Sequence, residues 1–222
     1  MNTYAPSVET LNTNVAGVLT RMTVGIFATM VAAGLLSATG LVPVLFSGVV
    51  GWIIVFLPLV MSLGLMWKGE SLTTEGIKLW FFAFAGAMGL SLSLLFYAYT
   101  SASIVMALLG TIVSFGALAA WGYFTKRDIS SWGSFLFAGV IGLIAVSLFN
   151  IWFESTALQM TLNVLAIVIF LGLTAYDMNR IRDMLWSSSG DVERLQWFGA
   201  LSLYINFINI FVSMLQLFGN RE

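Results

Sequence analysis

One carboxylate stands out among the residues that could do chemistry. Asp177 lies toward the end of a long apolar stretch and is followed by Asn179 and Arg180. A charged side chain at the centre of a bilayer costs about 2.5–3.5 kcal/mol on insertion scales, and less near the interface. Such a carboxylate therefore faces the protein interior or water, where it can bind a cation or exchange a proton. The structural alternative is that Asp177 pairs with Arg180 or Arg182 and only anchors its helix.

Two amides in the last apolar stretch are the natural partners of Asp177. Asn206 and Asn209 are three residues apart, so a helix places them on one face. Asn206 lies about 9 residues into its stretch, which is about 14 Å at 1.5 Å per residue, and Asp177 reaches a similar depth. The plain alternative is hydrogen bonding between helices, worth about 0.6 kcal/mol on average. The candidates for an ion pathway or a pH-sensing site are Asp177, Asn206, Asn209, Tyr176 and Arg180.

Residue types that the chain lacks exclude several classes of enzyme. The sequence has no Cys and no His, which removes zinc thiolate sites, haem ligation by His and Ser-His-Asp catalysis. An intramembrane aspartyl protease needs a second Asp, and a retinal protein needs a Lys; residues 197–218 contain neither. We therefore expect no enzyme activity, no cofactor and no bound metal. Asn150, Glu154 and Gln159 form a further polar group, which we interpret as a loop or, alternatively, an outer vestibule.

The composition predicts that these residues are positioned by membrane-spanning helices. Hydrophobic residues make up 59% of the chain and charged residues only 9%, whereas a soluble domain has about 25% charged residues. Lipid accommodates this excess of apolar surface, so we expect the bilayer as a partner. A net charge of −1 argues against nucleic acid, which needs a basic face.

Seven apolar runs are long enough to span a bilayer, which takes about 20 residues of helix. They lack the period-2 alternation of barrel strands, so the predicted fold is an all-α, polytopic seven-helix protein. The predicted organisation is a cytoplasmic tail of residues 1–20, a transmembrane domain of residues 21–219 and a short tail of residues 220–222. We expect small residues at helix contacts, at Ala83, Gly86, Gly89, Gly116, Ala120, Ala138 and Gly142. The runs are about 22–40, 44–66, 79–99, 102–124, 132–153, 157–179 and 197–218.

The distribution of basic residues predicts the orientation. Of the nine Lys and Arg residues, only Arg221 falls on one side of the predicted membrane. Positively charged loops stay in the cytoplasm, so we expect a cytoplasmic N-terminus and a C-terminus on the other side of a bacterial inner membrane. The eight residues on the cytoplasmic side are Arg21, Lys68, Lys78, Lys126, Arg127, Arg180, Arg182 and Arg194.

Several motifs resemble those of the transmembrane Bax inhibitor motif (Bax inhibitor-1) family, in particular its bacterial members. The matching segments are 124–130 (FTKRDIS), 172–177 (GLTAYD) and 199–209 (GALSLYINFIN). The resemblance begins near Met22 and covers almost the whole chain. It implies a seven-helix bundle with the last helix at its centre, calcium leak across the membrane and a role in stress protection.

The resemblance also implies a mechanism, from which this sequence departs. In the family, two aspartates near the cytoplasmic side share protons and open or close a pore with pH, and some members latch the pair with an Arg of the second helix. Asp177 matches the first aspartate, but Asn206 occupies the second position and no Arg occurs between Arg21 and Arg127. Because an amide does not titrate, two functions stay open. One is a weak calcium or cation leak past Asp177, and the other is a non-conducting regulator that binds another membrane protein, such as a quality-control protease.

Overall fold

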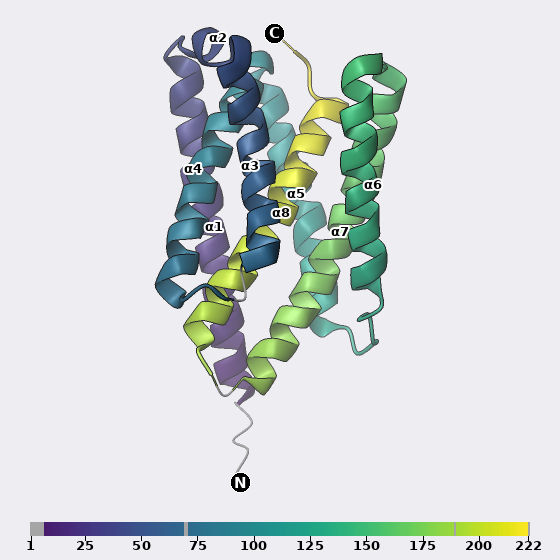
Figure 1. The fold of residues 1–222 in the computed structure, drawn as a ribbon. Coiled ribbons are helices and arrows are strands. Elements are labelled where there is room, and N and C mark those ends of the chain that lie inside the picture. Colours follow the sequence, from purple (N-terminus) through teal and green to yellow (C-terminus); the bar gives the residue numbers. More distant parts are fainter. Residues whose placement is uncertain (1–6, 69–70, 189, 222) are drawn as a thin grey trace. The chain divides into compact units, whose positions relative to one another are not determined.

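The structure is a computed structural model that describes residues 7–68, 71–188 and 190–221, without the side chains of residues 66–68. Within these residues the chain is helical and contains no named strand, and an isolated bridge joins Tyr99 to Arg221 (Figure 1). The helices are α1 (Val8–Ala38), α2 (Val42–Leu45), α3 (Gly48–Lys68), α4 (Thr74–Ala98), α5 (Ser101–Phe124), α6 (Trp132–Phe153), α7 (Thr156–Ser187) and α8 (Val192–Phe218). Seven of these described helices, all except α2, are long and apolar enough to cross a membrane, which confirms the predicted fold class.

The first helix begins earlier than predicted, at Val8 instead of residue 22. The hydroxyl of Ser7 accepts a hydrogen bond from the backbone N–H of Thr10 at 3.2 Å, which caps the helix N-terminus. Residues of the first turns are buried at helical spacing, at Leu11, Val15, Val18 and Met22. Residues 8–20 of the predicted tail are therefore part of α1, whereas residues 1–6 and residue 222 lie outside the described residues.

Four other helix limits also differ from the prediction. Helix α4 begins at Thr74 instead of residue 79. Helix α7 continues to Ser187 instead of residue 179, since Ile181 and Leu185 remain buried along its polar final turns. Helix α8 begins at Val192 instead of residue 197. The predicted second span is divided into the short helix α2 and helix α3, which begins at Gly48, a residue with a positive φ of 60°. A hydropathy window misses such ends because they are amphipathic or interrupted.

The chain divides into two compact units. The first unit comprises residues 1–101, 187–204 and 221–222, and the second comprises residues 102–186 and 205–220. In the first unit, α4 contacts α1, α2 and α3. A Cβ atom on Gly89 of α4 would lie 2.9 Å from the Cβ of Ala32 in α1, so only glycine allows this close approach.

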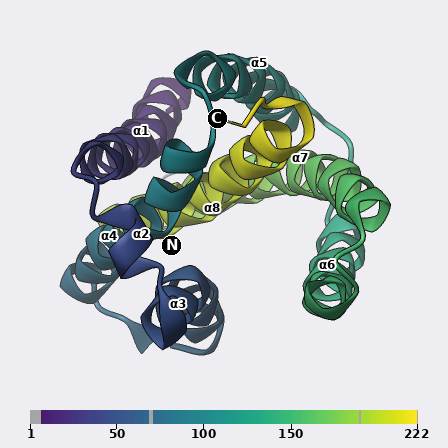
Figure 2. The same cartoon turned by 90° about the horizontal axis from the view of Figure 1, so that it is seen from above.

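In the second unit, α7 lies between α6 and the second half of α8 (Figure 2). The α5–α6 loop (residues 125–131) and the end of α7 mark one end of this unit, the loop end. The α6–α7 turn at Glu154 and Ser155 marks the opposite end, the turn end. This unit holds the candidate site.

Helix α8 is the most buried of the seven apolar helices in the described chain. In its most apolar segment 67% of the residues are buried, against 11–39% in the corresponding segments of the other six. It contributes residues up to Tyr204 to the first unit and residues from Ile205 to the second. This burial agrees with a last helix that is central to the packing.

The prediction of close helix contacts at small residues is wrong at six of its seven positions. Three alanines, Ala83, Ala120 and Ala138, are exposed, and so are three glycines. A Cβ atom on Gly86, Gly116 or Gly142 would meet nothing within 4 Å. The close contacts of the second unit lie instead at Gly122, where a Cβ atom would be 2.2 Å from the carbonyl oxygen of Ala175. Sequence spacing identifies small residues but leaves open which face of a helix meets a neighbour.

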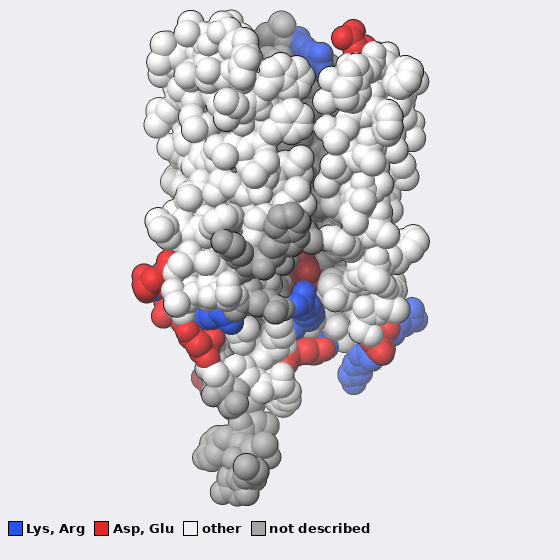
Figure 3. Space-filling model, viewed as in Figure 1, with Lys and Arg blue, Asp and Glu red and all other residues white. Residues whose placement is uncertain are grey.

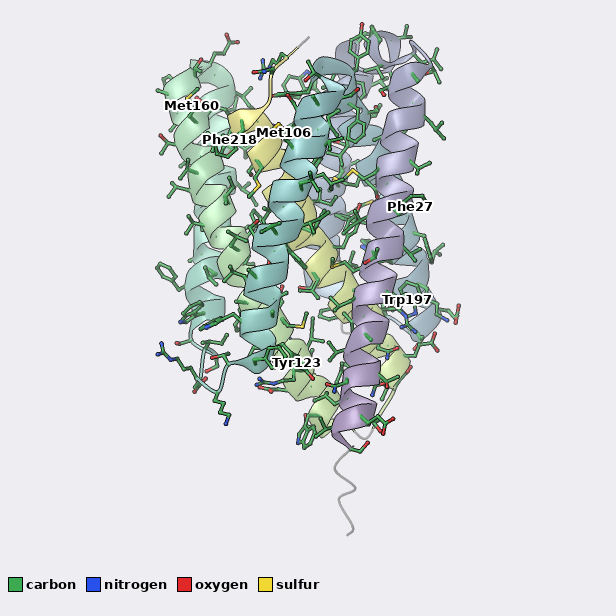
Figure 4. The ribbon with its side chains drawn as sticks, turned by 180° about the vertical axis from the view of Figure 1, so that it is seen from behind. Phe27, Met106, Tyr123, Met160, Trp197 and Phe218 are labelled. Atoms are coloured by element: carbon green, nitrogen blue, oxygen red, sulfur yellow. The ribbon has the colours of Figure 1, made fainter. Side chains whose placement is uncertain are left out.

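The sides of the helices present an apolar surface, as lipid contact requires. On the face shown in Figure 3 the helix sides are almost wholly white, and the charged side chains gather near helix ends. Phe27 and Met106, which are labelled in Figure 4, are 71% and 74% exposed. Exposed side chains of this type are costly in water and favourable in hydrocarbon.

Candidate functional site

The candidate site is built where α7 crosses α5 at the loop end of the second unit. Gly122 lets the α5 backbone approach Ala175 of α7. One turn further along α7, the side-chain amide of Asn179 donates to the carbonyl oxygen of Gly122 at 3.2 Å. Asp177 lies between Ala175 and Asn179 on α7, so these contacts fix the backbone that carries it.

Asp177 and Asn206 are in direct contact. The Nδ2 atom of Asn206 donates to the Oδ2 atom of Asp177 at 2.7 Å, which joins α7 to α8. Asn206 is only 3% exposed and Asp177 is half-buried. A short hydrogen bond to a carboxylate in a low-dielectric environment is stronger than one between neutral groups. The contact places a single ionisable group inside an apolar helix pair.

The other three candidate residues have their contacts elsewhere. The side chain of Asn209 donates to the carbonyl oxygen of Ile205 in its own helix at 2.8 Å. The ring of Tyr176 lies against Gly133 of α6, and Arg180 is exposed. The structure therefore brings together Asp177 and Asn206, and it does not add Asn209, Tyr176 or Arg180 to their contact.

Arg182 has a structural role that the sequence did not predict. Sequence analysis considered it only as a possible ion-pair partner of Asp177. Its Nη1 atom donates to the carbonyl oxygens of Tyr123 and Thr125 at 2.6 and 3.0 Å, and its Nη2 atom lies 2.7 Å from Asp183. Carbonyl groups at the C-terminus of a helix lack intrahelical partners and carry negative partial charge. Arg182 thus fastens α7 to the end of α5.

The α5–α6 loop contains a carboxylate that stays ionised near neutral pH. The hydroxyl and the backbone N–H of Ser130 donate to Asp128 and hold the pKa of this exposed carboxylate below its usual range. Its contribution to stability is therefore present above the ordinary pKa of Asp and is lost only in acid, as the pH falls through the lowered value. Asp128 is not a switch for the pH range 6 to 8.

A second polar contact lies at the turn end of the same unit. We call it the amide cluster, and it comprises Asn150 of α6, Gln159 and Asn163 of α7, and Gln216 of α8. Gln159 is its centre: its Nε2 atom donates to Asn163 at 3.1 Å and to Gln216 at 3.2 Å, and its Oε1 atom accepts from Asn150 at 3.2 Å. All four side chains are uncharged, so the cluster does not titrate.

Sequence analysis found only part of this cluster. Asn150 and Gln159 were recognised as a polar group, but Asn163 and Gln216 were not. The signal was present in the spacing, since Asn163 follows Gln159 by four residues and Gln216 follows Asn209 by seven, which places each pair on one helix face. Glu154, the third residue of that polar group, ends α6 with a positive φ of 47° and is exposed.

The first unit contains a buried hydroxyl pair that sequence analysis also missed. Thr29 of α1 donates to the carbonyl oxygen of Ala85 in α4 at 3.0 Å. The hydroxyl of Tyr204 in α8 lies 2.7 Å from the same threonine and therefore acts as the donor to it. This arrangement joins three helices of the first unit without any charge.

Basic residues are distributed unevenly within each unit. In the first unit, Lys78 contacts Glu193 at 2.9 Å and the Arg21 guanidinium lies 5.0 Å from the ring centre of Trp197, near the starts of α4 and α8. Arg221 contacts Tyr99 at the opposite end of α4. In the second unit, the described Lys and Arg residues all lie at the loop end: Lys126, Arg127, Arg180 and Arg182. The side chain of Lys68 lies outside the described residues.

These features define a class of protein: an all-helical membrane protein with one amide-bonded carboxylate inside a helix pair. Comparison with known proteins agrees with this class. Residues 11–222 match the family model described as inhibitor of apoptosis-promoting Bax1. The chain therefore belongs to the Bax inhibitor-1 family.

Bacterial relatives cover most of the chain. It is 36% identical over 220 residues to the inner membrane protein YbhL of Escherichia coli strain K12, covering 96% of this chain and 93% of that protein. It is 40% identical over 176 residues to an uncharacterized protein of Caulobacter vibrioides, covering 77% of this chain and 70% of that protein. It is 36% identical over 174 residues to the uncharacterized protein RP147 of Rickettsia prowazekii, covering 78% of this chain and 74% of that protein.

Proposed function

We propose that this protein is an inner-membrane cation leak pathway of low conductance, in which Asp177 is the ion-binding carboxylate. Calcium is the ion that family membership favours, and the physiological role that goes with it is protection against stress. An inner-membrane location is supported by the apolar helices and by the similarity to YbhL.

The observation that carries the proposal is the contact between Asp177 and Asn206 at 2.7 Å. A carboxylate within an apolar helix is costly, and a helix bundle that only needed to pack would place an apolar residue there. The amide donates one hydrogen bond to the carboxylate and leaves its charge in place. A cation passing between α7 and α8 would therefore meet a fixed negative charge.

The expected low conductance follows from the number of carboxylates in the proposed pathway. One carboxylate attracts a cation less strongly than two, and Asn206 contributes no charge at any pH. We therefore expect a weak leak that changes little between pH 6 and 8.

The alternative function is a non-conducting regulator that binds another membrane protein, such as a quality-control protease. The observation that favours it is Asn206 itself, because the amide removes the carboxylate pair on which gating in the family depends. In this function Asp177 serves only to join α7 and α8.

Calcium flux into liposomes that contain the purified protein tests the proposal. We expect weak flux in the wild type and flux at the level of protein-free liposomes for Asp177→Asn, which keeps the shape and removes the charge. Asp183→Asn is the matched control, because Asp183 lies on the same helix but is bonded to Arg182 at the loop end. Wild-type flux no greater than that of protein-free liposomes would contradict the proposed leak and favour the non-conducting regulator.

We also propose the orientation, with the loop end of the second unit in the cytoplasm. The support is the uneven distribution of basic residues within each unit. Alkaline phosphatase fused after Asp128 should be inactive, and the same reporter fused after Glu154 or at the C-terminus should be active. An active alkaline phosphatase fused after Asp128 would contradict this orientation and indicate the opposite one.

A further inference from the structure

The amide cluster has two nitrogen atoms without partners. In Asn163 and Gln216 the oxygen atoms accept hydrogen bonds from Gln159. Among the described residues, neither the Nδ2 atom of Asn163 nor the Nε2 atom of Gln216 has a hydrogen-bond acceptor, and neither is among the side-chain atoms fully buried without a partner. Both nitrogens therefore keep some accessible surface, although Asn163 as a whole is only 5% exposed.

The depth of Asn163 decides what these nitrogens contact. Asn163 lies seven residues after Thr156, the first residue of α7, which corresponds to about 10 Å along the helix. An amide N–H that faces hydrocarbon without an acceptor costs several kcal/mol. Accessible donors at this depth are stable only if water reaches them. Two accessible donors at this depth therefore favour water over lipid on this face of α7.

The charge at the turn end indicates which solutes would enter. In the described part of the second unit, the one charged side chain at this end is Glu154, which is exposed and lies beside the cluster residue Asn150. Lys126, Arg127, Arg180 and Arg182 lie at the far end of the unit, and Arg221, five residues after Gln216 in the chain, contacts Tyr99 of the first unit. The carboxylate of Glu154 therefore attracts cations to this end of the second unit and repels anions.

We propose that the amide cluster is the floor of a hydrated crevice at the turn end, which brings water to the depth of Asn163 and draws small cations to its mouth at Glu154. The inference rests on the proposed function in one respect, since the crevice would be the outer entry to the pathway that contains Asp177. Its hydration is independent of conduction and can be measured separately.

Single cysteines test the crevice, because the chain has no cysteine of its own. Three neighbouring positions on α7 differ only in their surroundings: Leu162 is 5% exposed and buried, Asn163 faces the cluster, and Val164 is 47% exposed on an apolar surface. A membrane-impermeant, cationic methanethiosulfonate is added to cells or outward-facing proteoliposomes. Because such reagents need a hydrated thiolate, we expect Asn163→Cys to react more than about tenfold faster than Leu162→Cys or Val164→Cys.

The charge selectivity gives a second measurement. Asn163→Cys should react faster with the cationic reagent than with an anionic one of the same size, and adding Glu154→Gln should remove that preference. If Asn163→Cys does not fold, Gln216→Cys compared with the buried Leu215→Cys replaces it.

Two results would overturn the inference. If Asn163→Cys reacts no faster than Leu162→Cys, the cluster is dry. If Val164→Cys reacts as fast as Asn163→Cys, this turn of α7 is in water on all sides and there is no crevice. Labelling at Asn163 with no cation flux in the wild type would instead support the crevice and contradict the proposed leak.

Discussion

The two polar contacts between α7 and α8 differ in the chemistry of their side chains. At the loop end, Asn206 donates to Asp177, and the pair contains one ionisable group. At the turn end, the amide of Gln159 in α7 donates to Gln216 in α8, and it also donates to Asn163 in its own helix. Asn163 and Asp177 are 14 residues apart on α7, or about 21 Å at 1.5 Å per residue. One helix pair thus carries a titratable contact at one end and a pH-independent contact at the other.

This difference indicates which end of the helix pair can respond to pH. The other end can only join the two helices or bind water. A carboxylate can gain or lose a proton, whereas an amide does not titrate. Any pH response of the helix pair must therefore begin at Asp177, with the amide cluster as a fixed point. Substitutions that add, remove or strain one contact at a time can test this division.

The largest effect is expected for Asn206→Asp, which gives the loop end a second carboxylate. Near neutral pH one proton would bridge the two acids. When both ionise, the repulsion is about 4 kcal/mol at 4 Å with an effective dielectric of 20. An energy of this size strongly shifts a two-state arrangement of helices. We expect calcium flux in liposomes that rises from pH 6 to 8, whereas wild-type flux stays low.

Asn209→Asp is the control for this prediction. Asn209 lies three residues further along the same helix and bonds to the carbonyl oxygen of Ile205, so an acid there does not face Asp177 at hydrogen-bond distance. We expect no comparable pH dependence. Equal flux in the wild type and Asn206→Asp at every pH would show that paired carboxylates do not gate this protein.

The sequence was sufficient for the spans and for the contact between Asp177 and Asn206. Hydropathy located α5 and α6 within one residue at each end, because their apolar runs coincide with the helices. The contact between Asp177 and Asn206 followed from matched depth in two antiparallel helices. Both inferences depend on distances along a helix axis, which sequence spacing determines directly.

The contacts that the sequence did not predict depend on how each helix is rotated about its axis. Spacing placed Asn206 and Asn209 on one face, but a rotation of the helix directs only Asn206 at Asp177. The same limitation explains why Gly116 was expected at a contact that Gly122 makes instead. Gln159 and Gln216 lie on different helices, and only tertiary packing brings them together.

The next largest effect is expected at the crossing that positions Asp177. In Gly122→Ala the new Cβ atom would lie 2.2 Å from the backbone oxygen of Ala175, so the helices must separate. Overpacking of this kind costs about 1–3 kcal/mol, and more where backbone must move. We expect a clear loss of thermal stability in detergent, measured by tryptophan fluorescence.

Gly116→Ala provides the matched comparison on the same helix. A Cβ atom there meets nothing within 4 Å. Replacing glycine by alanine inside a helix stabilises it by about 0.5–1 kcal/mol, so the melting temperature should be unchanged or slightly higher. A similar loss in both variants would mean that α5 does not cross α7 at Gly122.

A smaller effect is expected when the amide cluster loses its centre. Gln159→Leu removes the shared partner of Asn150, Asn163 and Gln216. Hydrogen bonds between membrane helices contribute about 0.6 kcal/mol on average and up to about 1.7, so we expect a loss of about 1–2 kcal/mol. The loss should be the same at pH 6 and pH 8, because no member of the cluster titrates. Thr161→Leu, at an exposed position on the same helix, should cause no loss. A loss that depends on pH would contradict the division between the two ends.

The smallest effect is expected at the turn that supports the cluster. Glu154 ends α6 in the left-handed region with φ of 47°, a conformation that costs a non-glycine residue about 1 kcal/mol. The turn is otherwise well bonded, since the side chain of Asn150 accepts from the backbone N–H of Ser155 at 3.1 Å and donates to its carbonyl oxygen at 3.3 Å. Glu154→Gly should therefore raise the melting temperature slightly, and Glu154→Val, which is β-branched, should lower it. Because neither change touches Asp177, calcium flux through Asn206→Asp should keep its pH dependence in both backgrounds. If Glu154→Gly abolished that dependence, the turn end would take part in gating and could not be treated as a fixed point.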